Sequence, residues 1–268
     1  DLYEWDLDGD GAFDDATGFV KQAEDALRHA NRALKTMSAC NSVLVHATDE
    51  AQLINDMCRV IIETGNYSCA WIGYAEHDDA KRIKPMAQAG FEPGFFQNLP
   101  LTWADDDAGQ TPVGIAIRNG VAAVVHDASN DPSLVVWRPA LVRVGINSIC
   151  VFPLTIAGET FGVLSICSRE RDAFEQDELT LLTELSEDMN FGIHTLRTRT
   201  ERDHAVEGRE RGLKKLRASL ETTIGAIAAT LDVRDPYTAG HERRVAELAT
   251  AIAREMGLPQ AQVEGIHF

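Results

Sequence analysis

The 268-residue chain is poor in aromatic and basic residues and has no long hydrophobic run. Aromatic residues make up 7% of it, and 25 Lys and Arg stand against 42 Asp and Glu, for a net charge of −17. Nucleic acid polymers and anionic lipid surfaces repel so acidic a protein, which excludes them as expected partners. Because no apolar stretch approaches the length of a membrane span and the first residues lack a signal-peptide pattern, we expect no membrane segment and a cytoplasmic location.

Cysteine is also scarce, and its spacing excludes two common uses. The chain has five cysteines, an odd number, and none forms a Cys-x-x-Cys pair. A disulfide framework needs an even set in an oxidising compartment, and structural zinc sites favour paired cysteines. The sequence therefore predicts reduced, mostly buried thiols. They are Cys40, Cys58, Cys69, Cys150 and Cys167.

The first nineteen residues form an acidic leader with seven acidic residues and no basic one. Alternating carboxylates followed by Gly11 are similar to the start of a calcium loop. Such a loop ends on a bidentate Glu, where this chain has Thr17. The stretch fits a solvated leader, and we expect at most weak calcium binding there. The candidate ligands are Asp6, Asp8, Asp10 and Asp14.

Hydrophobic periodicity predicts an α+β fold. Residues 18–47 and 50–64 have the 3–4 spacing of helices, and the same spacing returns after Phe174 for almost the rest of the chain. Short apolar runs between these helices predict strands, with a hairpin whose turn is Ala157-Gly158-Glu159. The predicted strands are 68–75, 81–89, 122–125, 148–156 and 160–168.

Four segments in this order are similar to a GAF domain. They read AWIGYAEHDDAKRIKPMAQAGFE, LTWADDDAGQTPVGIAIRNG, VVHDASNDPS and ICVFPLTIAGETFGVLSI. The resemblance covers roughly residues 38–196 and implies a mixed or antiparallel sheet flanked by helices. It also implies that a small ligand, unknown here, would lie between the sheet and the crossover segment 91–139.

Five residues of that region are candidates for the ligand pocket, because pockets combine apolar walls with a few placed polar groups. Three have structural alternatives: Trp103 as a core residue, Thr111 as a helix N-cap and Asp127 as a turn residue that bonds its own backbone. The five candidates are Trp103, Asp105, Thr111, His126 and Asp127.

The C-terminal stretch RDPYTAGHERRVAELATAIAREMGL resembles the opening of an HD-GYP domain, the metal-dependent phosphodiesterase family that acts on cyclic di-GMP. Pro236 follows a helix break at Asp235, and Thr238 is expected to cap the next helix. His241 shares a helical face with Val245, Leu248 and Ile252, which predicts that it points inward.

The HD-GYP resemblance makes His241 a metal ligand in the parent protein. The parent would hold two divalent metals, iron or manganese, since Tyr237 stands where members with a third metal have Glu. The His-Asp pair and the Gly-Tyr-Pro loop of the family are not in this sequence, and one His is too few for a catalytic metal. We therefore expect the chain itself to be inactive, with no cofactor.

These patterns predict a GAF signal sensor joined by a coiled-coil-like helix to an HD-GYP output domain, and a parallel homodimer. The alternative is a ligand-free GAF dimerisation scaffold of a degenerate, non-catalytic HD protein. The expected dimer stripes are Leu27, Leu34 and Met37, then Leu182, Leu185, Met189 and Leu196, then Leu213, Leu216, Leu220, Ile224 and Ile227. The alternative is that the stripes pack within the chain, on the GAF sheet and on the start of the HD-GYP domain, and it applies above all to part of residues 179–189. The predicted segments are an acidic leader (1–19), an N-terminal helix (20–37), the GAF domain (38–196), a charged linker (197–218) and the start of the HD-GYP domain (219–268).

Overall fold

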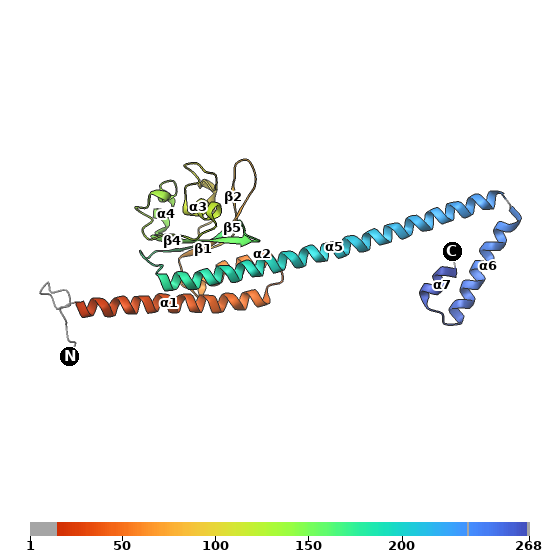
Figure 1. Ribbon diagram of the computed structural model, residues 1–268, viewed down its shortest axis with the longest axis horizontal. Helices are drawn as coiled ribbons and strands as arrows, with labels where there is room; N and C mark the ends of the chain where they lie inside the picture. Colours follow the sequence, from red (N-terminus) through yellow and green to blue (C-terminus); the bar gives the residue numbers. More distant parts are fainter. Residues whose placement is uncertain (1–14, 235, 267–268) are drawn as a thin grey trace. The chain divides into compact units, whose positions relative to one another are not determined.

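The computed structural model describes residues 15–234 and 236–266, which form two units that meet between Arg199 and Thr200 (Figure 1). The first unit contains a five-stranded antiparallel sheet in the order β2-β1-β5-β4-β3. Its strands are β1 (Cys69–Ala75), β2 (Ile83–Ala89), β3 (Ala123–Val125), β4 (Ser148–Ile156) and β5 (Glu159–Ser168). Its helices are α1 (Asp15–His46), α2 (Glu50–Glu63), α3 (Pro112–Asn119), α4 (Arg138–Val144) and the start of α5 (Gln176–Arg234), with short 3-10 turns at Phe95–Asn98 and Pro132–Leu134.

Both faces of the sheet are covered, which explains why its central strands are apolar without alternation. Helices α1, α2 and α5 lie on one face, and the crossover with α3 and α4 lies on the other (Figure 1). In β4, Cys150 and Phe152 point to the three-helix side, while Ile149 and Val151 point to the crossover side. The α+β architecture predicted from the sequence is confirmed.

The β4–β5 hairpin has a tighter turn than expected. The prediction of a three-residue turn is wrong, because Ile156 pairs with Glu159 and only Ala157 and Gly158 remain between the strands. Both residues have positive φ, 53° and 85°, as a two-residue turn that matches the twist of the strands requires. Ala157 carries a side chain in a conformation that glycine or asparagine adopts at lower cost.

This geometry predicts opposite effects at the two turn positions. Ala157→Asn should stabilise the protein by about 0.5–1 kcal/mol, since Asn-Gly is the preferred pair for this turn. Gly158→Ala should destabilise it by about 1 kcal/mol through backbone strain alone, because a Cβ there meets no atom within 4 Å. Urea unfolding of both variants measures the two changes. Equal midpoints for the two variants would contradict this assignment of the turn.

Pro85 lies in an edge strand, at a position that suits a residue without a backbone N–H. Strand β2 lies at the edge of the sheet, and the register of β1 against β2 shifts where Gly73 pairs with Pro85. A proline cannot donate a ladder hydrogen bond, so an edge strand with an irregularity tolerates it best. Both conditions are met at Pro85. Helix α4, by contrast, is not among the elements predicted from the sequence.

Part of the predicted dimer stripe is buried in the chain's own core. On α5, Leu182, Leu185, Met189 and Leu196 are at most 9% exposed and pack with α2 and the sheet. Met37 of α1 also packs against this core. The prediction that these five residues pair with a second chain is wrong, because the chain's own sheet and helices already cover them. Leu27 and Leu34 remain exposed.

The second unit consists of the rest of α5, then α6 (Pro236–Glu255) and α7 (Gln260–Ile266). Helix α6 begins before Thr238, so the prediction of Thr238 as its N-cap is wrong. Gly257, with φ 70°, follows the end of the helix, where a left-handed glycine is common. Ala253 of α6 and Val263 of α7 are both buried. No helix in the described residues is long and apolar enough to cross a membrane.

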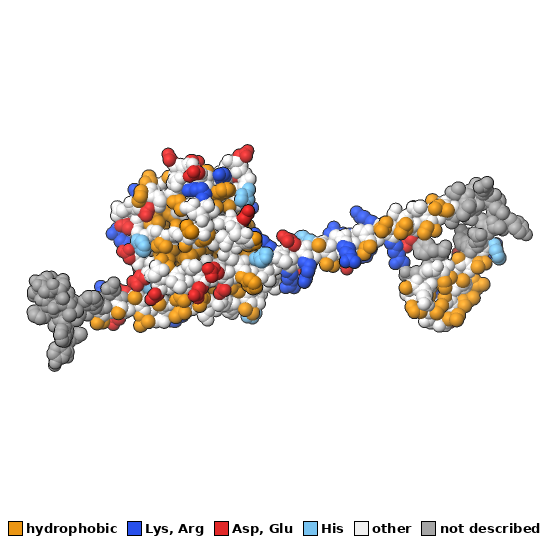
Figure 2. Space-filling view, in the orientation of Figure 1, with side chains coloured by type: hydrophobic (Ala, Val, Ile, Leu, Met, Phe, Trp, Pro, Cys, Tyr) orange, Lys and Arg blue, Asp and Glu red, His pale blue; other side chains and the backbone are white. Residues whose placement is uncertain are grey.

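The predicted inward face of α6 is exposed. His241 is exposed, and Val245, Leu248 and Ile252 are each at least half exposed. Figure 2 shows hydrophobic side chains gathered on the surface of α6 and α7. The short α7 covers only the side of α6 that carries Ala253, so the expectation that His241 points inward is wrong for this chain.

Candidate functional site

Aromatic side chains fill the space between the sheet and the crossover segment. Trp71 of β1 lies 4.9 Å from Phe96 and 6.4 Å from Trp137 between ring centroids, and the Trp137 indole N–H donates to the Pro100 carbonyl at 3.3 Å. Tilted rings at these separations form a packed cluster. The full set is Trp71, Phe91, Phe95, Phe96 and Trp137. A hydrophobic core therefore occupies the place where the GAF resemblance puts a ligand.

Two of the five predicted pocket residues are held by contacts of their own. The Trp103 indole N–H donates to the Glu76 carbonyl at 3.0 Å, and the Lys81 ammonium lies 4.8 Å from the ring centroid. Thr111 is 1% exposed and is the N-cap of α3, where its hydroxyl accepts from the Gly114 N–H. Both side chains fix the loop before α3.

The other three lie at the surface. Asp105 accepts a hydrogen bond from the Gln110 amide, and His126 lies 3.4 Å from an Asp172 oxygen. Asp127 accepts from the Asn130 side-chain amide and the Ser129 N–H, and the Asn130 bond lowers the pKa of this carboxyl. No hydrogen bond or ion pair in residues 15–234 joins residues 103–111 to residues 126–127, so the structure does not bring the five into one cluster. Ligand binding by them stays a prediction.

A buried ionic cluster, absent from the sequence prediction, fastens α1 to the start of α5. Glu178 is fully buried, and its carboxylate accepts from the Arg32 guanidinium at 2.9 Å and from the Tyr67 hydroxyl at 2.6 Å. The guanidinium also stacks 4.5 Å from the Tyr67 ring centroid. Burial raises the pKa of Glu178, against the opposing pull of both partners.

A second cluster fastens α5 where it leaves the domain. Glu50, at the start of α2, accepts from the Tyr74 hydroxyl at 2.6 Å and from Arg197 at 2.6 and 2.8 Å. The Arg197 guanidinium covers the Phe161 ring, 4.3 Å from its centroid. Burial by itself raises the pKa of the Glu50 carboxyl, but the hydrogen bonds from Arg197 and Tyr74 outweigh burial and lower this pKa. Both ends of the α5 segment in the domain are thus tied to the sheet and its covering helices.

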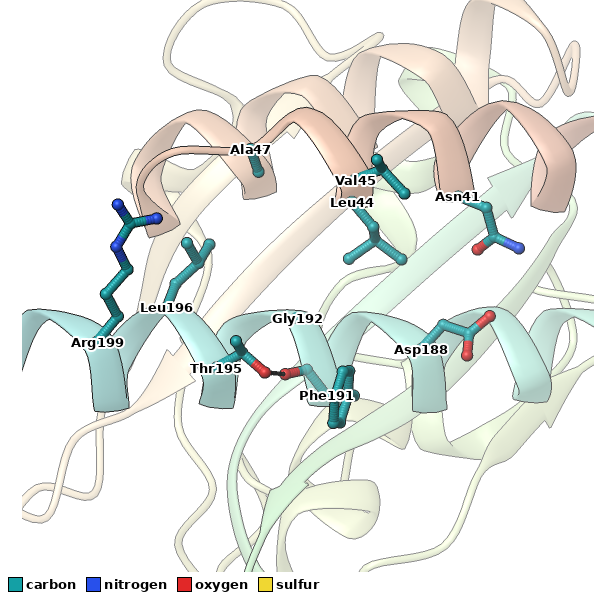
Figure 3. A pocket seen from close by; sticks show the side chains of 10 residues that line it. All are labelled: Asn41, Leu44, Val45, Ala47, Asp188, Phe191, Gly192, Thr195, Leu196 and Arg199. Atoms are coloured by element: carbon teal, nitrogen blue, oxygen red, sulfur yellow. Dashed lines mark hydrogen bonds between the residues drawn. The ribbon is translucent and has the colours of Figure 1, made fainter.

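An apolar groove of about 580 Å³ runs between α1 and α5 (Figure 3). Leu44 and Val45 of α1 form one wall, and Phe191 and Gly192 of α5 form the other. Leu44 points at Gly192, where an added Cβ would collide with the Leu44 side chain, so this glycine lets the two helices approach closely. Val45 is 81% and Phe191 73% exposed, which is unusual for large apolar side chains on a folded domain.

The described residues do not fit a metal centre. Among them, no group of three or more His, Cys, Asp or Glu side chains could hold a metal ion. His241 is exposed on α6 and belongs to no such group among the described residues. The predicted calcium ligands Asp6, Asp8, Asp10 and Asp14 lie outside the described residues.

Comparison with known proteins identifies the domain. The GAF domain of a phosphoenolpyruvate-protein phosphotransferase from Coxiella burnetii is 18% identical, with a TM-score of 0.54 over 64% of this chain and 98% of that one. A free methionine-R-sulfoxide reductase from Neisseria meningitidis, solved with its substrate, is 17% identical, with a TM-score of 0.53 over 63% of this chain and 93% of that one. At these identities the likeness shows the fold alone.

A search of curated proteins finds no match. The GAF domain family model matches residues 47–194, which span the sheet, its crossover and the first part of α5. This match covers more than half of the chain and confirms the domain expected over residues 38–196. The chain belongs to the GAF domain family.

Proposed function

We propose that the chain is the sensing and transmitting part of a signalling protein, in which the GAF domain sets the state of α5 and α5 passes it to an output unit. One observation carries the proposal: α5 is a single helix with two different surfaces. Leu182, Leu185, Met189, Ile193 and Leu196 are buried in the GAF core, with Phe191 as an exposed exception, whereas Val206, Leu213, Leu216, Leu220, Ile224 and Ile227 are all exposed. A continuous helix that belongs to both units is an element through which a change in one unit can bias the other.

The proposed active form is a parallel homodimer joined along α5. The exposed series Val206, Leu213, Leu220 and Ile227 repeats every seven residues, with Leu216 between its members. A seven-residue apolar repeat on a helix buries itself best against a second copy of the same helix. Each of these side chains is at least half exposed, and exposed apolar surface of this extent favours association.

The stretch 197–212 between the two surfaces is well suited to a conformational change. Nine of its sixteen residues are charged, Val206 is its single large apolar residue, and Figure 2 shows basic side chains along it. When the apolar spacing of three and four residues is continued upstream from Val206, it falls on Arg202 and Arg199, which are charged. Loose pairing here lets the helices rotate or shift at low cost in free energy.

For the output unit we propose the beginning of an HD-GYP domain, so that the whole protein would hydrolyse cyclic di-GMP. Support comes from the residue match in 234–258 and from the exposed apolar face of α6, a surface that further helices of such a domain would cover. The whole protein would hold its metals with His241 together with residues outside this chain. Hydrolysis of cyclic di-GMP by the whole protein tests this step.

The five unpaired cysteines support a reducing compartment, the cytoplasm.

A second candidate, the ligand-free dimerisation scaffold, is favoured by the aromatic cluster between sheet and crossover. Packed Trp and Phe side chains leave little reason for a small molecule to enter, since binding would have to displace a formed core. In this account the GAF domain joins two copies of a non-catalytic HD protein and binds no ligand.

Native mass spectrometry of the purified chain separates the candidates. Both accounts predict a species of twice the 29.4 kDa chain mass, and the scaffold predicts no added small molecule, because aromatic residues pack in the region of the expected pocket. A reproducible mass increment that disappears on unfolding would establish the ligand sensor and contradict the scaffold. Only a 29.4 kDa species would contradict the dimer on which both accounts rest.

A further inference from the structure

Two of the five buried cysteines face each other across neighbouring strands. Cys69, the first residue of β1, lies directly opposite Cys167 of β5 in the antiparallel register. Both side chains belong to the core on the crossover side of the sheet, whereas Cys40, Cys58 and Cys150 belong to the core on the other face. Hydrogen bonding with the Cys69 thiol, together with burial, raises the pKa of Cys167 well above its ordinary value, so Cys167 stays protonated. The fold thus separates one pair of thiols from the other three.

The spacing of this pair suits a disulfide. Directly opposite residues of an antiparallel sheet have Cα atoms roughly 4.5–5.5 Å apart, within the separation of roughly 4.4–6.8 Å that disulfides span. Their Cβ atoms are also roughly 4.5–5.5 Å apart, so a disulfide, with a Cβ separation of about 3.8 Å, would draw the two strands together by about 1 Å. Formation of the bond therefore needs a small movement of a strand end and no rearrangement of the fold.

The pair lies near the end of both strands, where the sheet opens most easily. Cys167 comes two residues before the exposed Arg169, and Ser68, which precedes Cys69, is half-buried. Ser68 closes this end, since its N–H donates to the Cys167 carbonyl at 2.9 Å and its hydroxyl accepts from the Arg169 N–H at 3.0 Å. Strand ends held by few hydrogen bonds open locally at a lower free energy than the core. Such opening exposes Cys69 and Cys167 to a small neutral oxidant before it exposes the thiols of the three-helix core.

We propose that Cys69 and Cys167 form a redox-active pair, which hydrogen peroxide converts from two thiols to a disulfide. Cys69 reacts first, because Cys167 stays protonated: the Cys69 sulfur attacks one peroxide oxygen, the O–O bond breaks, and the departing hydroxide leaves as water with the thiol proton. The Cys167 sulfur then attacks the sulfenic sulfur, the S–O bond breaks, and a second water leaves with the Cys167 proton. Each cysteine loses one electron and the peroxide gains two, and a thiol reductant restores the pair.

Oxidation at this place would reach α1 through Glu170. This residue follows Cys167 by three positions, and Ser148 holds it by donating its hydroxyl to the Glu170 carbonyl at 2.7 Å. A Glu170 carboxylate oxygen lies 3.6 Å from the Arg28 guanidinium and 3.5 Å from the His29 ring of α1. A shift of about 1 Å at the end of β5 therefore loosens contacts of α1 beside the start of α5. This inference rests on the proposed function and deepens it, because it makes an oxidant the signal of the GAF domain.

Thiol mapping of the reduced chain after treatment with hydrogen peroxide tests the pair. The protein is denatured, alkylated, digested without reductant and analysed by mass spectrometry. We expect a peptide that links Cys69 to Cys167, its loss on reduction, and alkylation of the other three cysteines as in untreated protein. Cys167→Ser should form no disulfide. The matched control Cys150→Ser, which removes a buried thiol from the other face of the sheet, should form it at the wild-type rate.

Hydrogen exchange of the α1 amides measures the transmitted change. We expect the exchange rates of residues 28–32 to rise by at least about 5-fold on oxidation of the wild type, which corresponds to about 1 kcal/mol, and to stay unchanged in peroxide-treated Cys167→Ser. Five free thiols after peroxide, or loss of all five at one rate, would overturn the inference and leave the proposed function standing. A disulfide that leaves the exchange of α1 unchanged would overturn the oxidant as the signal. The proposed function fails separately, if native mass spectrometry shows only single chains.

Discussion

Replacement of Leu213 and Leu220 by Asp is expected to turn the dimer into monomers. Both side chains are more than half exposed on a single chain, so the substitutions remove no contact within it. In the proposed seam they would place four carboxylates between apolar side chains, and burial of unpaired charge costs several kcal/mol. We expect the dissociation constant to rise by at least about 100-fold.

Light scattering at tens of micromolar measures this change as a fall to the 29.4 kDa of one chain. The matched control is Ala218→Asp with Thr222→Asp, which adds the same charge to the opposite face of the same helical turns. Equal loss of the dimer in both double variants would show a general effect of charge. Retention of the dimer in the Leu variant would move the interface to the GAF domain.

The second large effect is expected at the buried cluster of α1 and α5. Arg32→Met keeps much of the side-chain volume but removes the cation that pairs with the fully buried Glu178. The loss of one partner of a buried pair typically costs about 3 kcal/mol, because the remaining charge is left without compensation. The control Arg28→Met removes a guanidinium whose side chain is 59% exposed and should change the stability by about 0.5 kcal/mol or less.

The destabilisation by Arg32→Met should depend on pH with a defined sign. In the folded protein burial raises the pKa of Glu178, so its contribution to stability is present at low pH and is lost as the pH rises through the folded value. Without Arg32, which opposes this increase, the pKa of Glu178 rises further. The difference in unfolding free energy between wild type and variant should therefore grow from about pH 5 to about pH 8. Urea titrations that give the same difference at both pH values would contradict this account.

The sheet and its hairpin follow from local sequence, whereas the partners of the helices do not. Strand runs such as residues 148–156 and the presence of a turn at Gly158 are identified from neighbouring residues, but the length of the turn is not. Leu182 to Leu196 and Leu213 to Ile227 have the same apolar spacing, yet one set packs on the sheet and the other is exposed. Periodicity identifies the face of a helix but not what covers it, because that depends on contacts between distant residues.

The functional contacts show the same limit. The sequence prediction favoured polar residues of the crossover loops, and the structure instead fills that region with Trp71, Phe96 and Trp137. It did not include Glu178 or Arg197, because charged residues on helices are usually solvated. One signal for Glu178 was present: it lies four residues before Leu182 and seven before Leu185, in line with the buried stripe.

Disulfide cross-linking at Leu220 tests most directly whether two copies of α5 pair in parallel and in register. The five native cysteines are buried and unpaired, so a cysteine introduced on the exposed stripe would be the accessible thiol among the described residues. In a parallel seam equivalent residues of this series face each other, within the Cα separation of roughly 4.4–6.8 Å that a disulfide needs. We expect Leu220→Cys to form a covalent dimer rapidly on oxidation and Ala218→Cys, on the outer face, to form little. Cross-linking of Leu220→Cys that is no faster than that of Ala218→Cys would contradict the parallel dimer.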